Sequence, residues 1–459
     1  MGVRDTTGPA DRFTGALAAA LAREADLPQG LRRAAVAAAL STTRIGAQRY
    51  QYRVTPSAAP KRRTGGGYGL AVAMARPGSR RSRTQATLKQ RLRFRAPGLT
   101  PRGYPRKCQI STASRADPGE LARGLETVKA LLSTRMGGPE TLSVGEVPDP
   151  LPSDDEILIT VKACGVNFPD TLVIEDKYQF RPSRPFSPGG EVAGIVTETG
   201  KNISHVRPGD RVIGWCMWGG MAQKVVVTPE HCIPIPDTMP FDEASAFIMT
   251  YGTSYYALQH RGNLKRGETL LVLGAAGGVG LAAVELGKAM GAQVVAAVST
   301  EEKLALAIEH GAHSGLVYPR GPFDKTALRS LSGLFKQGCP TSGADVILDS
   351  VGGDYSDAAV RSIAWDGRFL VVGFPAGVPR LPLNLPLLKS CQVVGVFWAA
   401  WMDRDPVAFR TSTRELFEFY QQGAIRPAIS ARFPLAKGGE AIASLGNRSA
   451  MGKVVVMIE

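Results

Sequence analysis

A cluster of glycines separates two apolar segments in the stretch TLLVLGAAGGVG, residues 269–280. Glycine permits a tight turn and lets a ligand approach the backbone, and a helix N-terminus offers N–H groups to a pyrophosphate. Helical spacing of apolar residues follows this turn, so the pattern predicts a dinucleotide site. The expected backbone contacts are Ala276, Gly277, Gly278 and Val279.

The residues after the next apolar run indicate which dinucleotide fits. NAD enzymes usually carry an acid there to bind the ribose 2′-hydroxyl, but Val298 is followed here by Ser299 and Thr300, with Lys303 one helical turn later. A hydroxyl and a cation suit a 2′-phosphate, which predicts NADP(H). Alternatively, Ser299 caps the next helix with Glu302 completing a capping box, and Lys303 is a solvated residue. The two roles are compatible.

The elements that position these residues alternate between strand and helix from about residue 251. Expected strands cover 269–273, 293–298, 344–350, 368–373 and 392–397, and expected helices cover 279–292 and 301–312. This alternation predicts an α/β fold with a doubly wound parallel sheet. Residues 126–250 carry short strands broken by Pro and Gly, which predicts a β-rich domain. After residue 397, a helix at 411–423 leads to a final strand.

The net charge of +15 over 459 residues comes from one end of the chain. Residues 1–125 contain 24 Lys and Arg but 6 Asp and Glu, so we expect a disordered basic tail. It has the composition of a mitochondrial transit peptide, but a mispredicted extension before the true start of the protein and a nucleic-acid-binding arm are alternatives. The expected localisation is mitochondrial or cytoplasmic, and it is mitochondrial if the basic tail is a genuine transit peptide. The nearly neutral remainder makes nucleic acid an unexpected partner.

The sequence indicates neither a protein held by clustered cysteines nor a membrane-spanning protein. The six cysteines are scattered without a CxxC spacing, which is typical of free thiols in a reducing compartment. Apolar runs are too short or too interrupted by glycine to cross a bilayer, so no membrane insertion is expected.

From about residue 127 to 459 the chain resembles the medium-chain dehydrogenase/reductase superfamily, and most of all its zinc-free quinone oxidoreductase branch. The motifs that carry this resemblance are GVNFPDTL (165–172), PGGEVAG (188–194), VRPGDRV (206–212), GTSYYAL (252–258), GAAGGVG (274–280) and SAMGKVVVMIE (449–459). The resemblance implies a GroES-like catalytic domain at 126–250, a Rossmann NADP-binding domain at 251–396, and a return to the catalytic domain at 397–459.

The positions that would hold catalytic zinc in related alcohol dehydrogenases read Asn167, Gly190 and Met249 here. None is a competent zinc ligand in that arrangement, so no metal is expected. Acceptors that need no metal remain, namely quinones and enones. Glu191 is expected to be structural, paired with a nearby base or with backbone donors.

The resemblance also implies individual site residues. Asn167 and Tyr178 match residues that line the nicotinamide and substrate cleft, where they would hydrogen-bond the acceptor or only position the nicotinamide amide. Leu172 replaces a frequent Tyr, and the segment 319–343 is longer and more polar than usual. Besides the glycine turn and Ser299, expected cofactor contacts are Thr253, Lys303, Tyr318, Phe374, Phe397 and Arg448.

The expected activity is hydride transfer from NADPH to a quinone or an α,β-unsaturated carbonyl. Alternatives are an enoyl-thioester reductase of the same fold and an NADPH-binding protein of low turnover with an RNA-binding or structural role. Superfamily members usually form dimers or tetramers through edge strands of the cofactor domain. The segment 392–401 is a candidate for such an edge, and a buried strand is the alternative.

Overall fold

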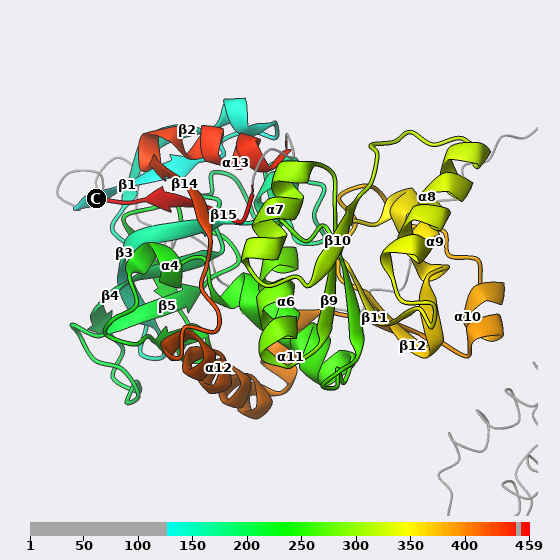
Figure 1. Ribbon diagram of the computed structural model, residues 1–459. Coiled ribbons are helices and arrows are strands. Elements are labelled where there is room, and N and C mark those ends of the chain that lie inside the picture. The colour runs from blue at the N-terminus through cyan, green and yellow to red at the C-terminus, as the bar shows by residue number, and fades with distance from the viewer. Residues whose placement is uncertain (1–125, 447–450) are drawn as a thin grey trace, which may run out of the picture. The chain divides into compact units, whose positions relative to one another are not determined.

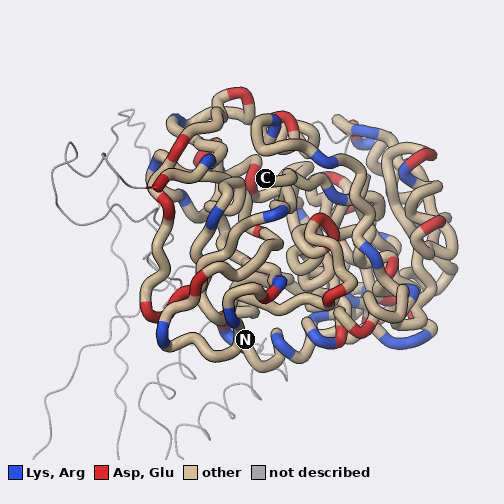
Figure 2. Tube along the Cα trace, turned by 90° about the vertical axis from the view of Figure 1, so that its left-hand side faces the viewer, with Lys and Arg blue, Asp and Glu red and all other residues tan. Residues whose placement is uncertain are grey.

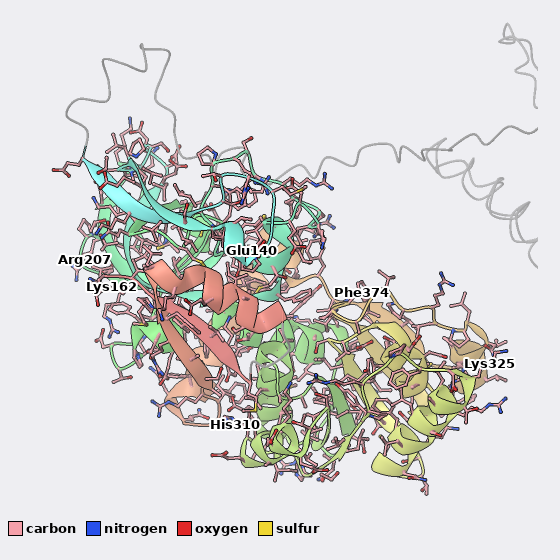
Figure 3. The ribbon with its side chains drawn as sticks, turned by 90° about the horizontal axis from the view of Figure 1, so that it is seen from above. Glu140, Lys162, Arg207, His310, Lys325 and Phe374 are labelled. Atoms are coloured by element: carbon pink, nitrogen blue, oxygen red, sulfur yellow. The ribbon has the colours of Figure 1, made fainter. Side chains whose placement is uncertain are left out.

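The computed structural model describes residues 126–446 and 451–459, which form two large β-sheets, a two-stranded sheet and the helices around them (Figure 1). The basic tail predicted for residues 1–125 and the cofactor contact predicted at Arg448 lie outside the described residues. Seen from above, the β-rich part with Lys162 lies beside the Rossmann part with Lys325 (Figure 3).

The β-rich part is built on a seven-stranded sheet in the order β14-β15-β3-β4-β5-β7, with β6 also paired to β3. Strand β3 (Ile157–Val166) is buried along most of its length because β4 and β15 flank it. The other strands are β4 (Glu191–Thr199), β5 (Arg211–Trp215), β6 (Lys224–Val227), β7 (Cys232–Pro234), β14 (Ile429–Pro434) and β15 (Lys453–Met457).

A separate antiparallel pair, β1 (Thr127–Leu132) and β2 (Ser143–Pro148), accompanies this sheet. Three short helices lie in the connections of the β-rich part. They are η1 (Pro139–Thr141) between β1 and β2, α3 (Phe168–Val173) between β3 and β4, and η2 (Pro229–His231) between β6 and β7.

The second sheet has six parallel strands in the order β10-β9-β8-β11-β12-β13. Its strands are β8 (Thr269–Leu273), β9 (Gln293–Val298), β10 (Ser314–Val317), β11 (Ala344–Asp349), β12 (Ile363–Val371) and β13 (Gln392–Gly395). Its helices are α6 (Gly278–Ala289), α7 (Glu301–Glu309), α8 (Lys325–Gly338), α9 (Gly353–Val360) and α10 (Asn384–Lys389). The predicted doubly wound parallel sheet is confirmed.

Helices cover both faces of this sheet because successive side chains of a strand point to opposite sides. Leu270 and Val272 of β8 belong to one core with residues of α6 and α7. Leu271 and Leu273 belong to another core with residues of α8 and α9.

The two sheets are joined twice. The first connection contains α4 (Phe241–Ala244), the π-helical turn η3 (Ile248–Gly252), α5 (Thr253–Tyr255) and a second π-helical turn, η4 (Tyr256–Arg261). The second contains α11 (Trp398–Arg404) and α12 (Pro406–Gln421), followed after β14 by η5 (Leu435–Lys437) and α13 (Gly438–Gly446). Strand β15 then enters the β-rich sheet between β14 and β3.

The structure corrects parts of the expected organisation. Segment 392–401 is a sheet edge only over β13, since Trp398–Arg404 is helical. The polar segment 319–343 contains α8, which buries Leu331 and Phe335 against the sheet.

Lys and Arg are interspersed with Asp and Glu along the described trace (Figure 2). Among the described residues, no helix combines the length and the apolar character needed to span a bilayer.

Candidate active site

The glycine turn lies at the carboxyl end of β8, as the sequence predicts. Gly274 has a positive φ of 70°, and the backbone N–H of Gly274 donates to the carbonyl oxygen of Ala297 at 3.0 Å. A Cβ atom at Gly280 would lie 2.1 Å from the carbonyl oxygen of Gly274, so helix α6 packs directly on the turn. At Gly277, by contrast, a Cβ would meet only that same oxygen, at 3.4 Å. The turn is therefore open on the side of Gly277, next to the N-terminus of α6.

The carboxyl end of β9 carries hydroxyl groups in place of an acid. Thr300 is the N-cap of α7, because its side chain accepts the backbone N–H of Lys303 at 3.3 Å. The suggestion that Ser299 caps this helix was wrong by one position. Ser299 and Lys303 are half-buried, and the N–H of Tyr318 donates to the carbonyl oxygen of Val298 at 2.8 Å. The predicted cofactor contacts Ser299, Lys303 and Tyr318 thus lie at or just after the neighbouring ends of β9 and β10.

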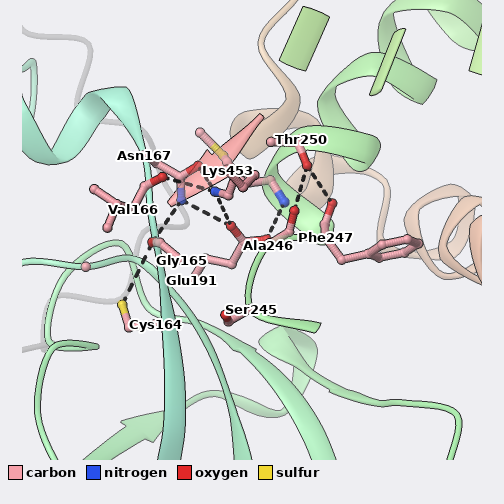
Figure 4. Close-up of polar contacts among 12 residues, drawn as sticks. Cys164, Gly165, Val166, Asn167, Glu191, Ser245, Ala246, Phe247, Thr250 and Lys453 are labelled. Carbon is pink, nitrogen blue, oxygen red and sulfur yellow. Dashed lines mark hydrogen bonds and ion pairs between the residues drawn. The ribbon is translucent and has the colours of Figure 1, made fainter. Parts of the chain in front are cut away.

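A buried polar network lies where β3, β4 and β15 meet (Figure 4). The ammonium of Lys453 donates to Asn167 Oδ1 at 2.7 Å and to the carbonyl oxygen of Val166 at 3.1 Å, and lies 3.3 Å from Glu191 Oε2. The other oxygen of Glu191 accepts the backbone N–H of Met249 at 2.8 Å. Glu191 therefore pairs with a base and a backbone donor, as expected.

These contacts fix the orientation of the Asn167 amide. Its Nδ2 donates to Glu191 Oε2 at 3.1 Å and to the carbonyl oxygen of Gly165 at 3.3 Å, while its Oδ1 accepts from Lys453. The reverse orientation would place the NH₂ group against an ammonium and the oxygen against a carboxylate. Both N–H donors of the Asn167 amide are thus used within the protein, so the amide has only its oxygen to offer a ligand.

Asp170 supports the same corner of the site. Its carboxylate accepts the backbone N–H of Asn167 at 2.7 Å and that of Gly189 at 3.1 Å. Burial raises the pKa of Asp170 to about 6, partly opposed by these hydrogen bonds. Burial likewise raises the pKa of the Cys164 thiol well above its ordinary value, so this thiol serves as a packed apolar group.

A mainly apolar cavity opens beside this network. The predicted residues Asn167, Tyr178 and Phe397 line it together. Phe374 does not belong to its lining and is 42% exposed on the Rossmann part (Figure 3), and Leu172 does not line it either. Thr253 is buried in α5, in the connection between the two sheets. The remaining lining residues are Pro169, Asp170, Val173, Phe180, Gly190, Trp215, Met217, Met249 and Ala399.

The three positions compared with zinc ligands, Asn167, Gly190 and Met249, all line this one cavity. Their side chains do not fit a zinc ion, because an engaged amide, a glycine and a thioether replace the usual thiolates and imidazole. Across residues 126–446 and 451–459, no group of three His, Cys, Asp or Glu side chains is arranged to hold a metal.

Sequence reasoning missed Lys453 and the aromatic wall formed by Phe180 and Trp215. Lys453 had one available signal, since a lysine opens an otherwise apolar strand, KVVVM. Phe180 and Trp215 had none, because Phe180 lies in the connection after α3 and Trp215 ends β5, and only the folded chain brings both to one cavity.

Two domain families match parts of the chain. The alcohol dehydrogenase GroES-like domain matches residues 153–237, and the zinc-binding dehydrogenase family matches residues 278–414. The quinone oxidoreductase-like protein 2 homolog of Nematostella vectensis is 36% identical over 337 residues, covering 72% of this chain and 90% of that protein. The quinone oxidoreductase of Homo sapiens is 29% identical over 349 residues, covering 74% of this chain and all of that protein.

Solved structures show the same fold. A probable oxidoreductase from Mycobacterium abscessus is 34% identical with a TM-score of 0.63, covering 73% of this chain and 100% of that one. The Escherichia coli quinone oxidoreductase complexed with NADPH is 27% identical with a TM-score of 0.64, covering 72% of this chain and 99% of that one.

Proposed function

Since the chain belongs to the medium-chain dehydrogenase/reductase superfamily, and within it to the quinone oxidoreductase-like protein 2 family, we propose that it is an NADPH-dependent, zinc-independent oxidoreductase. Its acceptor is a quinone or an α,β-unsaturated carbonyl. One observation carries this proposal: the three zinc-ligand positions Asn167, Gly190 and Met249 line a single apolar cavity without a metal-binding side chain.

The cofactor assignment is supported by the residues at the carboxyl ends of β8, β9 and β10. The open side of the turn at Gly277 would hold the pyrophosphate, and Ser299, Lys303 and Tyr318 would hold the 2′-phosphate. When bound, NADPH supplies the hydride, and the protein supplies position and electrostatics. The NADPH complex of the Escherichia coli relative supports the same assignment.

The cavity suits a planar, uncharged acceptor. Trp215, Met217 and Phe397 present apolar surface that excludes water from the reacting atoms. Tyr178 is the proposed hydroxyl partner of the acceptor oxygen, and solvent or this hydroxyl supplies the proton. Asn167 has only a lone pair to offer, so its proposed partner is an N–H of the nicotinamide carboxamide.

The proposal includes assembly with a second copy of the chain through β13. This strand is at the edge of the Rossmann sheet, and its Val393 is 44% exposed. Leu383, just before α10, is 79% exposed, and Leu387, within α10, is 80% exposed. A free strand edge beside an apolar helix is a surface that a copy of the same edge covers well.

Cofactor preference is the first test. Calorimetry on the full chain should show tighter binding of NADPH than of NADH, and Lys303→Ala should remove most of this preference. Lys288→Ala, on the exposed side of α6, is the matched control and should retain it. Equal affinities in the wild type would refute the NADP assignment, and no binding of either nucleotide would refute the oxidoreductase proposal.

The acceptor is tested by oxidation of NADPH with quinones, enones and enoyl thioesters in the presence of EDTA. Turnover of quinones or enones supports the proposal. Turnover of enoyl thioesters alone would replace it with the thioester reductase, and loss of turnover in EDTA would refute zinc independence.

A further inference from the structure

Lys453 is a charged residue at a place where the fold itself requires none. Its side chain is 5% exposed, and the next three residues of β15 are buried valines. Removing an ammonium from water costs several kcal/mol unless partners compensate for it. Here Asn167, Val166 and Glu191 receive all three N–H donors, so the charge is fully paired. An apolar residue would continue the strand pattern but would leave the buried Glu191 carboxylate without its cation. Lys453 and Glu191 therefore act as a pair, and both contact the Asn167 amide.

The geometry allows Lys453 to fix the orientation of the Asn167 side chain. Lys453 holds Oδ1 from one side, and Glu191 holds Nδ2 from the other. The amide is thereby prevented from turning over. Asn167 is at the same time a residue that lines the cavity, with its oxygen as the only polar atom it can offer there.

The residue before Lys453, Gly452, is hydrogen-bonded to the glycine turn, where the pyrophosphate is proposed to bind. The N–H of Gly452 donates to the carbonyl oxygen of Ala276 in the glycine turn at 2.8 Å, and Gly277 and Gly452 form a β-bridge. The side chain of Lys453 then passes Gly278, where an added Cβ would lie 3.1 Å from Lys453 Cδ. Two consecutive residues therefore contact both the proposed pyrophosphate turn and the proposed nicotinamide partner.

We propose that Lys453 is a positioning residue that, together with Gly452, sets Asn167 relative to the glycine turn, so that Asn167 Oδ1 receives the nicotinamide carboxamide. This inference rests on the proposed function, because it assumes that NADPH occupies the site. It goes further by naming a residue in the β-rich sheet that determines where the nicotinamide half of NADPH binds. The same residue does not determine where the adenosine half binds.

The test compares NADPH with 2′-phospho-ADP-ribose, which lacks the nicotinamide. Lys453→Met is expected to leave the affinity for 2′-phospho-ADP-ribose unchanged and to weaken NADPH roughly tenfold, the scale of a lost hydrogen bond of a charged network. The fluorescence of bound NADPH should move toward that of free NADPH, and hydride transfer should slow by about a hundredfold, as misplacement by about 1 Å predicts.

A second variant separates positioning from folding, because Lys453→Met leaves the Glu191 carboxylate buried without its cation. In Glu191→Gln/Lys453→Met the pair is neutral, so thermal stability should recover while the NADPH defects persist. Lys224→Met is the matched control: Lys224 lies in β6 of the same sheet, opposite Thr160 of β3, and pairs with Asp149 just after β2. It should leave both affinities and the NADPH fluorescence unchanged.

The outcomes are distinct. Wild-type affinity and fluorescence for NADPH in the double variant would overturn the inference while leaving the proposed function standing. Equal weakening of NADPH and 2′-phospho-ADP-ribose, or loss of the fold in both variants, would show a structural role for Lys453 and also overturn it. Absence of NADPH binding by the wild type would refute the proposed function and this inference together.

Discussion

His310 Nδ1 lies 2.6 Å from Glu285 Oε1, which joins the end of α7 to α6. The other oxygen of Glu285 accepts the Tyr251 hydroxyl at 2.6 Å and the backbone N–H of Arg426 at 3.0 Å. One buried carboxylate therefore connects both helices to the π-helical turn η3 and to the segment that returns to β14. This contact makes the stability of the junction depend on pH.

The hydrogen bond to Glu285 raises the pKa of His310 above its ordinary value, opposed by partial burial and aided by Glu309. The stabilisation is fully present below the unfolded-state pKa of about 6.5 and is lost as pH rises through the folded-state pKa. We expect His310→Gln to reduce the fall in unfolding free energy between pH 6 and pH 8, measured by urea denaturation. His205→Gln, at an exposed position, should leave that fall unchanged. An unchanged fall in His310→Gln would contradict the prediction.

Two glycines of the turn should respond differently to alanine. Gly277→Ala should keep the thermal stability of the free protein, because only one atom lies near the added Cβ, but weaken NADPH by at least about tenfold. Gly280→Ala should lower the stability of the free protein by about 1–3 kcal/mol, because its Cβ would collide with the backbone of Gly274. Melting curves with and without NADPH distinguish the two. Equal stability of both free variants would contradict this assignment.

Gly452→Ala should destabilise the entry to β15. Gly452 has a φ of 71°, and an added Cβ would lie 2.2 Å from the carbonyl oxygen of Ala428. We expect a loss of about 1–3 kcal/mol in the free energy of unfolding. Gly333→Ala in α8, where a Cβ meets no atom within 4 Å, should instead gain up to about 1 kcal/mol. Chemical denaturation of both variants measures the difference, and a neutral Gly452→Ala would argue against the strained entry.

Assembly through β13 should be sensitive to charge at Leu387. Leu387→Lys leaves the core intact because the residue is 80% exposed, but it places a cation in the proposed contact. We expect the variant to sediment as a monomer with unchanged thermal stability in dilute solution. Val407→Lys, at a 65% exposed position on α12, is the control and should keep the wild-type mass. If the wild-type protein sediments as a monomer, the proposed assembly through β13 is refuted.

The parts of the fold that follow from local pattern were predictable. The glycine turn, β8 and α6 show their period and their turn residues within a short window of sequence. Strand β10 was not predicted, because it has only four residues with little buried surface. Helix α8 was overlooked although a signal existed, since Leu328, Leu331, Leu334 and Phe335 recur at helical spacing within the polar segment.

The site was predictable only in pieces. Asn167, Tyr178 and Phe397 were singled out and do line one cavity. The orientation of the Asn167 amide was not accessible, because it depends on Lys453, which is 286 positions away along the chain. The helix cap at Thr300 was misplaced by one residue, since Ser299 is an equally good capping residue by type.

The placement of β15 beside β3 also governs how the chain is completed during synthesis. Lys453 and Val166 are 287 positions apart, and every strand of the Rossmann sheet is encoded between them. The ribosome therefore releases all of that sheet before β15 exists. On the edge of β3 that β15 later joins, β6 pairs only with Ile157–Thr160, so residues 163–166 wait unpaired while the Rossmann sheet folds. An unpaired, apolar strand edge is a site for association with other chains. The arrival of β15 ends this exposure, and in the same step it delivers Lys453 to Asn167.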